Sequence, residues 1–209
     1  MKEQLKSKIK IVYVAIMVGV ITLLLFFCMN RKNDVESIPI SYQHATYSID
    51  YDNLNAVVGD ADYVFIGTIA DEEGTVYKNP VKIEDTDGNV VEATSPYTNY
   101  KVDVLKNIKG SLTTEEPIQI QKSGGISEDK SEYLLYEGDE LPAVGQTYVF
   151  FAYAQPDGSL LLSGPVSNME TKIEKGEDLE STTEFKEVME AYENQIQTER
   201  QRYTSKYEV

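Results

Sequence analysis

The longest uninterrupted run of apolar residues lies close to the start of the chain. Residues 11–29, IVYVAIMVGVITLLLFFCM, contain no charged side chain. As a helix, a run of this length rises about 28 Å, which nearly matches the roughly 30 Å hydrocarbon core of a bilayer. The run also lacks the polar stripe that a helix on the surface of a soluble domain carries. It therefore predicts a transmembrane anchor over residues 11–29.

Basic residues on either side of this span predict its orientation. Two of them, Arg31 and Lys32, follow the span, whereas four lysines precede it: Lys2, Lys6, Lys8 and Lys10. Short segments rich in lysine and arginine stay on the cytoplasmic side of a membrane. We therefore expect a single-pass protein of the cell membrane, with residues 1–10 as a cytoplasmic tail and the C-terminal domain outside the cell.

The only cysteine, Cys28, lies at the end of the apolar run. Bacterial lipoprotein signals place Gly, Ala or Ser directly before the modified cysteine, whereas this chain has Phe27 there. Cleavage of an ordinary signal peptide requires a small-residue site after the run, and the nearest match is the segment 35–37. The pattern favours an anchor that is not cleaved. A single cysteine also excludes an internal disulfide framework.

After the anchor, polar and apolar residues change from an irregular to a periodic pattern. Residues 30–49 are polar and aperiodic, which predicts a linker. Residues 50–60 predict a short helix with its apolar residues on one face and Gly59 as its end. Later, Tyr100 and Val102 alternate with charged neighbours, which is typical of a half-buried strand. The same pattern predicts strands over residues 63–70, 81–84, 90–94, 97–105, 118–121, 147–154 and 159–163.

Turn residues predict how these strands connect. The acidic segment DEEG, residues 71–74, is expected to end the first strand. The pair Asp87-Gly88 predicts a tight hairpin between the second and third strands. The segment 155–158, QPDG, predicts a turn after the run 147–154, which is the most apolar strand and is expected to be central.

The last part of the chain has the period of a helix. Ser181 and Glu184 fit a capping box, and apolar residues recur at helical spacing from Phe185 to Ile196. We predict a helix over residues 182–203. Its apolar stripe is expected to pack on the preceding β domain, with docking onto a partner as the alternative.

Three segments of the chain, taken in order, resemble a known family. The segments ADYVFIGTI, YKVDVLKNIKG and GQTYVFF, with a Gly-Gly break before the last, resemble extracellular OB-fold domains of the netrin/TIMP-like type. They also resemble domains of membrane-anchored surface proteins from Gram-positive bacteria. The matching residues are Ala61, Asp62, Val64, Gly67, Tyr100, Val102, Val104, Gly110, Gly145, Tyr148 and Phe150.

This resemblance implies a fold that is mainly β. It places a small OB-like β-barrel over residues 50–177, followed by an amphipathic C-terminal helix within residues 178–209. Several short strands with regular turns favour a barrel independently, because closure removes exposed sheet edges. Inhibitors of the TIMP type depend on disulfides and on an N-terminal cysteine, whereas this chain has no cysteine after Cys28. That inhibitory mechanism therefore does not carry over.

The charge of the outer region limits its partners. Beyond residue 30 lie fifteen of the nineteen basic residues and thirty-four of the thirty-five acidic residues, a net charge of −19. Such a surface repels nucleic acid and anionic headgroups, so no nucleic-acid partner is expected. It favours basic or metal-bridged partners, or serves solubility alone.

The residue inventory argues against common catalytic chemistry. The single histidine, His44, lies in the predicted linker, and Cys28 lies in the predicted span. A serine or cysteine nucleophile with a histidine base and a zinc site both lack their usual residues, so we expect no enzyme and no cofactor. A pair of carboxylates that hydrolyses a cell-wall glycan stays as an alternative.

One acidic loop has a partial metal-binding pattern. In residues 85–89, DTDGN, Asp85 and Asp87 precede a glycine, as in a calcium loop. Alignment on that glycine puts Ile83 and Thr94 at ligand positions that should be acidic. A hairpin turn is therefore the preferred interpretation, and Asp85 and Asp87 stay as candidates for surface calcium binding.

Tyrosines provide the candidate binding residues. The chain has fifteen tyrosines and no tryptophan, and OB-type barrels often bind ligands with aromatic faces. Four tyrosines in the strand region are candidates for a groove. The alternative is that tyrosine suits half-exposed strands, with its ring buried and its hydroxyl hydrated. The four candidates are Tyr97, Tyr100, Tyr133 and Tyr136.

These observations predict a membrane-anchored, extracytoplasmic binding protein without catalytic activity. Its ligand is expected to be a protein, a peptide or a cell-wall component. One alternative is an immunity-type or protective factor against cationic peptides, which the net charge of −19 motivates because opposite charges speed encounter. The other alternative is the carboxylate-dependent wall hydrolase.

Overall fold

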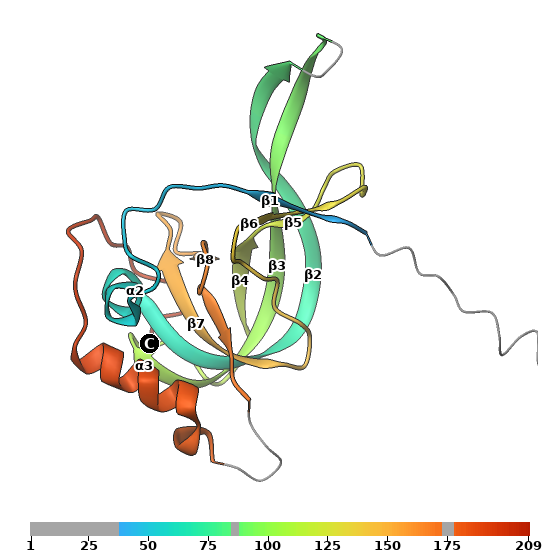
Figure 1. The fold of residues 1–209 in the computed structure, drawn as a ribbon. Coiled ribbons are helices and arrows are strands. Elements are labelled where there is room, and N and C mark those ends of the chain that lie inside the picture. Colours follow the sequence, from blue (N-terminus) through green and yellow to red (C-terminus); the bar gives the residue numbers. More distant parts are fainter. Residues whose placement is uncertain (1–37, 85–87, 173–177) are drawn as a thin grey trace, which may run out of the picture. The chain divides into compact units, whose positions relative to one another are not determined.

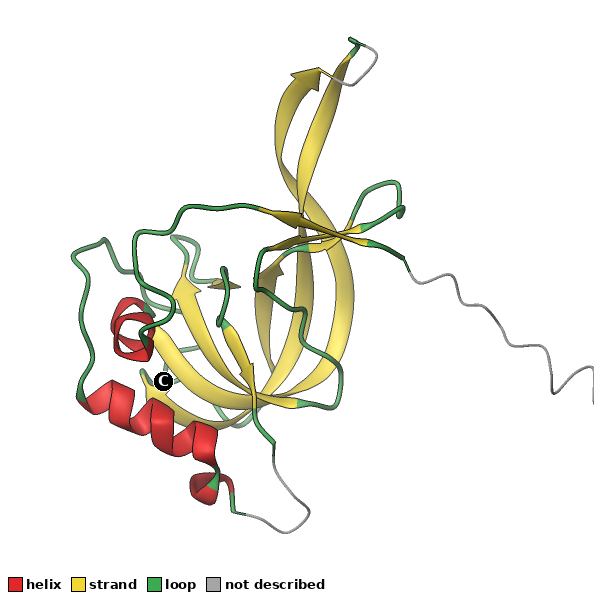
Figure 2. Cartoon of the chain, in the orientation of Figure 1, coloured by secondary structure: helices red, strands yellow, loops and turns green. Residues whose placement is uncertain are grey.

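A computed structural model describes residues 38–84, 88–172 and 178–209, which belong to one compact unit of residues 38–209. The unit is mainly β (Figure 2). The predicted cytoplasmic tail and anchor, residues 1–10 and 11–29, lie outside the described residues. Within the described part, no helix is both long enough and apolar enough to cross a membrane.

Five strands of the unit close into a ring. The strands are β2 (Tyr63–Glu84), β3 (Val90–Lys109), β4 (Ile118–Ser123), β8 (Leu160–Leu162) and β7 (Thr147–Ala154). They are hydrogen-bonded in the order β2-β3-β4-β8-β7, and β7 pairs back with β2 (Figure 1). The β4–β8 pair is parallel and the other ring pairs are antiparallel. The short strand β9 (Asn168–Glu170) extends this sheet beside β7.

A small second sheet crosses the base of the long β2–β3 hairpin (Figure 1). It consists of β1 (Ile40–Gln43), β6 (Tyr133–Tyr136) and β5 (Gly125–Ile126), in the order β1-β6-β5. The β1–β6 pair is parallel and the β5–β6 pair is antiparallel. The segment predicted as a linker, residues 30–49, thus contains a strand, which pairs with a partner about ninety residues further along the chain.

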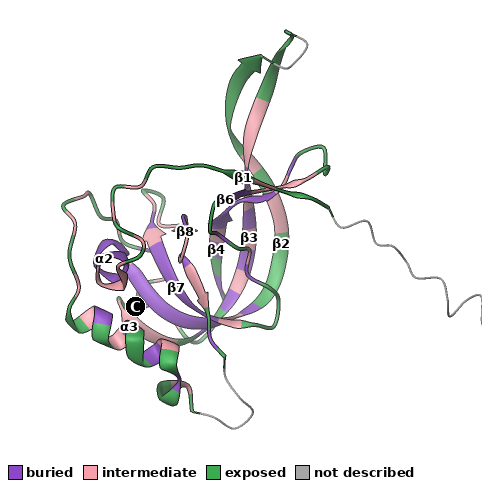
Figure 3. Ribbon diagram, viewed as in Figure 1, coloured by how far each residue is buried: buried purple, intermediate pink, exposed green. Residues whose placement is uncertain are grey.

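Strand β7 and the first part of β2, residues 63–69, are buried on both faces (Figure 3). Phe65 of β2 belongs to a core that includes residues from all five ring strands, whereas its neighbour Val64 packs in a second core with the helices. In β7, Phe150 likewise packs in the ring core, whereas its neighbour Phe151 packs in the second core with the helices. Burial of both faces explains why these two segments are continuous apolar runs and show no alternation.

The helices cover one side of the ring. Helix α2 (Leu54–Asp60) and helix α3 (Thr183–Glu193) contribute Val57, Val58 and Val188 to the second core. A short 3₁₀ helix, η1 (Leu179–Ser181), precedes α3. The expectation that the C-terminal helix packs on its own domain is confirmed.

The predicted C-terminal helix was too long, and its cap was misplaced. Thr182 caps α3 by accepting a hydrogen bond from Phe185 N, in place of the predicted Ser181. The helix ends at Glu193, and residues 195–209 form an extended tail. This tail follows the ring, where Ile196 N donates to Asn55 O at 2.9 Å and Tyr203 packs against the ring core.

The prediction that the acidic segment 71–74 ends the first strand is wrong, because β2 continues through this segment to Glu84. Its backbone pairs with β3 across several register shifts, with Glu72 opposite Tyr100. The predicted hairpin arms, residues 81–84 and 90–94, are confirmed as the outer end of this longer hairpin. Asp85 and Asp87 lie outside the described residues.

Gly59 lies inside α2, whereas the sequence predicted it as the helix end, and Ala61 takes the C-cap position. A Cβ atom on Gly59 would lie 1.9 Å from Ile196 O. The residue is therefore a glycine because the C-terminal tail contacts the helix backbone there.

Candidate functional site

The outer face of β3 and β4 carries neutral amide side chains. Asn99 pairs with Gln121 across the two strands, and Lys101 pairs with Gln119. Side chains of a strand alternate between its faces. These residues therefore project away from the ring, because their neighbours Tyr100 and Ile120 are buried in the core.

Hydrogen bonds join this row to the outer part of the hairpin. Gln121 Nε2 donates to Asn99 Oδ1 at 2.7 Å, and Lys78 Nζ donates to Gln121 Oε1 at 2.5 Å. Asn79 Nδ2 donates to the Tyr97 hydroxyl at 3.1 Å, and Lys78 Nζ lies 5.3 Å from the centroid of the Tyr97 ring. Asn79 has a φ of 55°, a conformation that asparagine tolerates better than most residues.

The turn between β7 and β8 forms the opposite wall. Asp157 accepts hydrogen bonds from Ser159 N at 3.0 Å and from Ser159 Oγ at 2.6 Å, and both lower the pKa of the Asp157 carboxyl. Gly158 O accepts a hydrogen bond from Lys206 N of the C-terminal tail at 2.9 Å. The tail therefore holds this turn in place.

Between these walls lies a groove of about 460 Å³, with an adjoining hollow of about 250 Å³. We call the two together the amide groove. Amide side chains both donate and accept hydrogen bonds without carrying charge. The amide groove is lined by Glu73, Lys78, Asn79, Tyr97, Asn99, Gln119, Ile120, Gln121, Gln155, Pro156, Asp157, Ser159, Leu160, Leu161 and Lys206.

A second groove, of about 570 Å³, lies between the small sheet and the ring, and we call it the apolar groove. The small sheet contributes apolar side chains on one face, because Ile40 pairs with Tyr133 and Tyr42 pairs with Leu135. The apolar groove is lined by Ile40, Tyr42, Glu72, Thr75, Thr98, Ile126, Tyr133, Leu135, Asp139, Glu140, Leu141, Pro142, Ala143 and Val144.

A buried ion pair lies behind the apolar groove. Lys122 points inward from β4, and its Nζ lies 2.6 Å from both carboxylate oxygens of Asp139 and 2.6 Å from Ser167 Oγ. Burial lowers the pKa of Lys122 and raises that of Asp139, while each charge opposes the shift of the other. A serine beside a lysine is the composition of one class of nucleophile, but here the Lys122 amine is also paired with both carboxylate oxygens of Asp139.

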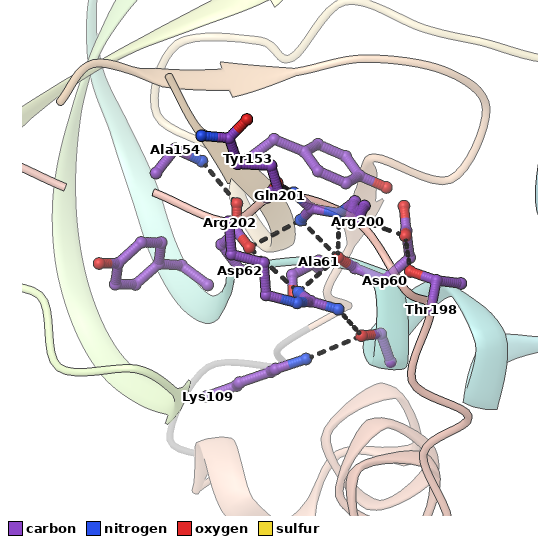
Figure 4. A network of polar contacts seen from close by, with 12 residues as sticks. Asp60, Ala61, Asp62, Lys109, Tyr153, Ala154, Thr198, Arg200, Gln201 and Arg202 are labelled. Carbon is purple, nitrogen blue, oxygen red and sulfur yellow. Dashed lines mark hydrogen bonds and ion pairs between the residues drawn. The ribbon is translucent and has the colours of Figure 1, made fainter. Parts of the chain in front are cut away.

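A further polar network fixes the C-terminal tail (Figure 4). Asp62 Oδ1 accepts from Arg200 Nη2 at 2.7 Å and from Arg202 Nη1 at 3.0 Å, while Asp62 Oδ2 accepts from Ala154 N at 3.0 Å. Lys109 Nζ donates to Val58 O at 2.7 Å. These contacts join the tail to β7 and to the end of α2, so the network stabilises the fold.

The four candidate tyrosines do not form one site. Tyr97 lines the amide groove and Tyr133 lines the apolar groove. Tyr136 packs edge-on against Tyr47, with ring centroids 6.4 Å apart. Tyr100 is fully buried in the ring core. Strand alternation had already placed Tyr100 on the same face as Val102, which was the signal against a role in a surface groove.

Neither the amides nor the buried pair is identifiable from the sequence alone. In the predicted strand 118–121, Gln119 and Gln121 are only the polar positions between two isoleucines. Lys122 carries no local signal of burial, because its partners Asp139 and Ser167 follow 17 and 45 residues later. Both partners lie outside the ring strands, Asp139 after β6 and Ser167 between β8 and β9.

The described residues give little support for a metal site or for chemistry at the single histidine. Within residues 38–84, 88–172 and 178–209, no group of three or more His, Cys, Asp or Glu side chains is placed to hold a metal ion. His44 is largely exposed, and its Nδ1 lies 2.7 Å from Glu137 Oε2. No protein-family model matches the chain, and a search of curated proteins finds no similar sequence.

Proposed function

We propose that the chain is a membrane-anchored, extracytoplasmic binding protein without catalytic activity of its own. Its anchor is the apolar segment 11–29, and its binding domain is the β unit of residues 38–209. The amide groove binds a neutral, hydroxyl-rich polymer, and a glycan strand of the cell wall is the form of that ligand outside the membrane. The observation that carries the proposal is the row of uncharged amides beside the half-exposed ring of Tyr97.

The strand order supports an OB-like barrel as the binding scaffold. Counted along the chain from β2, the ring runs 1-2-3-5-4, the fourth strand pairs with the first, and the third and fifth are parallel. An OB-fold is a five-stranded Greek-key barrel that binds ligands on the face of its second and third strands, between the loops after its first and fourth strands. Those parts here are β3, β4, the long hairpin and the turn 155–159, and all of them line the amide groove.

The chemistry of the groove favours hydroxyl groups as its ligands. A sugar hydroxyl both donates and accepts hydrogen bonds, as the amides of Asn99, Gln119 and Gln121 do. The flat, apolar face of a sugar ring fits against an aromatic side chain such as Tyr97. The net charge of −19 beyond residue 30 disfavours a phosphate polymer at the same face.

The carboxylates of the groove support binding in preference to hydrolysis. Hydrolysis of a glycosidic bond requires one carboxyl group that is protonated and acts as the general acid. The hydrogen bond from Lys101 lowers the pKa of Glu73, and the hydrogen bonds from Ser159 lower the pKa of Asp157. Both groups are therefore charged at neutral pH, and neither is suited to donate a proton.

A sedimentation assay with purified cell walls tests this proposal. The full-length chain in non-ionic detergent is incubated with peptidoglycan sacculi, and the bound fraction is measured against sacculus concentration. Tyr97→Ala should weaken binding about tenfold, because stacking on an aromatic ring is worth about 1–3 kcal/mol per ring. Gln121→Ala should weaken it less, through the loss of one hydrogen-bonding side chain.

Two matched variants serve as controls. Gln197→Ala removes an exposed amide from the C-terminal tail, and Tyr42→Ala removes a tyrosine from the apolar groove; both should bind sacculi like the unmodified chain. Equal binding by Tyr97→Ala and Tyr42→Ala would contradict the assignment of the ligand to the amide groove. Release of soluble glycan fragments by the purified chain would contradict the absence of catalysis.

A further inference from the structure

We infer that the apolar groove is a second binding site, which takes an extended, cationic segment of polypeptide with apolar side chains. The site shares no lining residue with the amide groove. Its occupant has a different chemistry, so the inference does not depend on the proposed function. Three observations carry it: the lining of the groove, the charge of its rim and the open edge of β1.

The lining of the groove is suited to apolar side chains. Nine of its fourteen residues are aliphatic, aromatic or proline. Ile40 and Tyr42 are 50% and 56% exposed, and Val144 on the opposite wall is 54% exposed. Exposed apolar side chains that gather around one groove mark an interaction site. Isolated exposed apolar residues on a surface would carry no such meaning.

The charge at the rim selects a cation. Glu72 and Glu140 line the groove and are exposed, and neither forms an ion pair with a basic side chain of the described residues. The third carboxylate, Asp139, is paired with Lys122. No lysine, arginine or histidine lines the groove within the described part of the chain. Lysine or arginine side chains of a bound segment would therefore find two carboxylates, Glu72 and Glu140, that no described basic side chain neutralises.

The edge of the small sheet favours an extended conformation of the bound segment. Pro39 O accepts from Tyr133 N and Gln43 O accepts from Glu137 N, so alternate residues of β1 face β6. The backbone groups of the intervening Ile40 and Tyr42 point to the outer edge, where no strand of the described residues pairs with β1. A segment that adds a strand there, a known mode of peptide recognition, extends the apolar face of the sheet.

A binding titration with a defined peptide tests the inference. The probe is a fluorescent nonapeptide of alternating lysine and leucine, added to the full-length chain in non-ionic detergent, with empty micelles as background. Fluorescence anisotropy should show saturable binding that weakens as salt is added. The double variant Glu72→Gln/Glu140→Gln should bind the probe about tenfold more weakly at low salt, and Tyr42→Ala should weaken binding at all salt concentrations.

Matched controls decide between a specific site and general attraction to an acidic protein. Glu115→Gln/Glu116→Gln changes the net charge equally on a distant loop and should alter the affinity by less than twofold. A probe with serine in place of leucine, or with alternate backbone amides N-methylated, should lose at least tenfold in affinity. Equal weakening by the two double variants, or equal binding of the serine probe, would overturn the inference. Loss of sacculus binding in Tyr97→Ala with intact probe binding would separate this site from the amide groove.

Discussion

Lys122 is the residue whose environment differs most from what its chemistry predicts. Its side chain is fully buried on a strand face otherwise occupied by Ile118 and Ile120. Removal of one partner from a buried ion pair leaves an uncompensated charge, whereas replacement of the pair by apolar side chains is often neutral. Lys122 and Asp139 therefore act as one unit.

The first prediction concerns this pair. Lys122→Met should lower the free energy of unfolding by about 3–5 kcal/mol, because Asp139 stays buried without its cation. The double variant Lys122→Met/Asp139→Leu should recover most of that loss. Denaturant unfolding of the unmodified chain, the single variants Lys122→Met and Asp139→Leu, and the double variant measures both quantities. If the double variant loses as much stability as the sum of the two single variants, the ion pair is not a coupled unit.

The second prediction concerns Lys109. Burial, and next the Arg202 guanidinium, lower the pKa of its amine to about 8 from an ordinary 10.5. Because the unfolded chain keeps this proton up to the ordinary value, the contribution of Lys109 to stability rises as the pH increases from about 8 to about 10.5. NMR titration of the ¹³C-methylated amine should give a midpoint near pH 8. Arg202→Gln should raise that midpoint, and a midpoint near 10.5 in the unmodified chain would contradict the account.

At the scale of elements, the long hairpin and the C-terminal tail depend on contacts that are distant in sequence. Strand β2 continues through the acidic segment 71–74 because β3 supplies backbone partners along its length. The tail is extended because its side chains bind elsewhere: Arg200 binds Asp62, and Tyr203 packs on the ring core. A helical tail to residue 203 would separate these contacts.

The third prediction tests the contact between this tail and α2. Gly59→Ala should lower the free energy of unfolding by about 1–3 kcal/mol, because the new Cβ overlaps Ile196 O and the backbone must shift. In a chain that ends at Asn194 the overlap is gone. The same substitution should then be neutral or stabilising, because alanine favours a helix over glycine by about 1 kcal/mol. Thermal unfolding measures both effects. If Gly59→Ala lowers the free energy of unfolding equally in the full chain and in the chain that ends at Asn194, the tail is not the reason for the glycine.

These elements show what the sequence pattern can and cannot predict. Alternation correctly gave the strands around Tyr100 and Ile120, because local periodicity reports burial directly. A continuous apolar run gave the strand around Phe150, and the turn residues 155–158 gave the hairpin of β7 and β8. It could not give the ends of β2 and α3, which tertiary pairing decides. The candidate site could be predicted only in part. Tyr97 is identified by its residue type, whereas Gln121 belongs to the amide groove only because β2 and the β7–β8 turn lie beside it.

At the scale of the whole molecule, the orientation of the proposed anchor determines which ligands the two grooves can meet. The fourth prediction tests it in a Cys28→Ser background, which removes the only native thiol. Thr114→Cys, on an exposed loop of the β unit, should react with a membrane-impermeant maleimide in intact cells. Ser7→Cys should react only after the cells are permeabilised. The reverse pattern of labelling would place the β unit in the cytoplasm and remove the cell wall as a source of ligand.

The most direct test of the central claim is to observe the amide groove while it binds. The full-length chain, labelled with ¹⁵N in detergent, is titrated with soluble glycan fragments, and the side-chain NH₂ signals are followed by NMR. The account predicts saturable shifts of the Asn99, Gln119 and Gln121 side-chain amides, with the Gln197 amide unchanged. Shifts that are absent from these three side chains while the fragments bind elsewhere would contradict it.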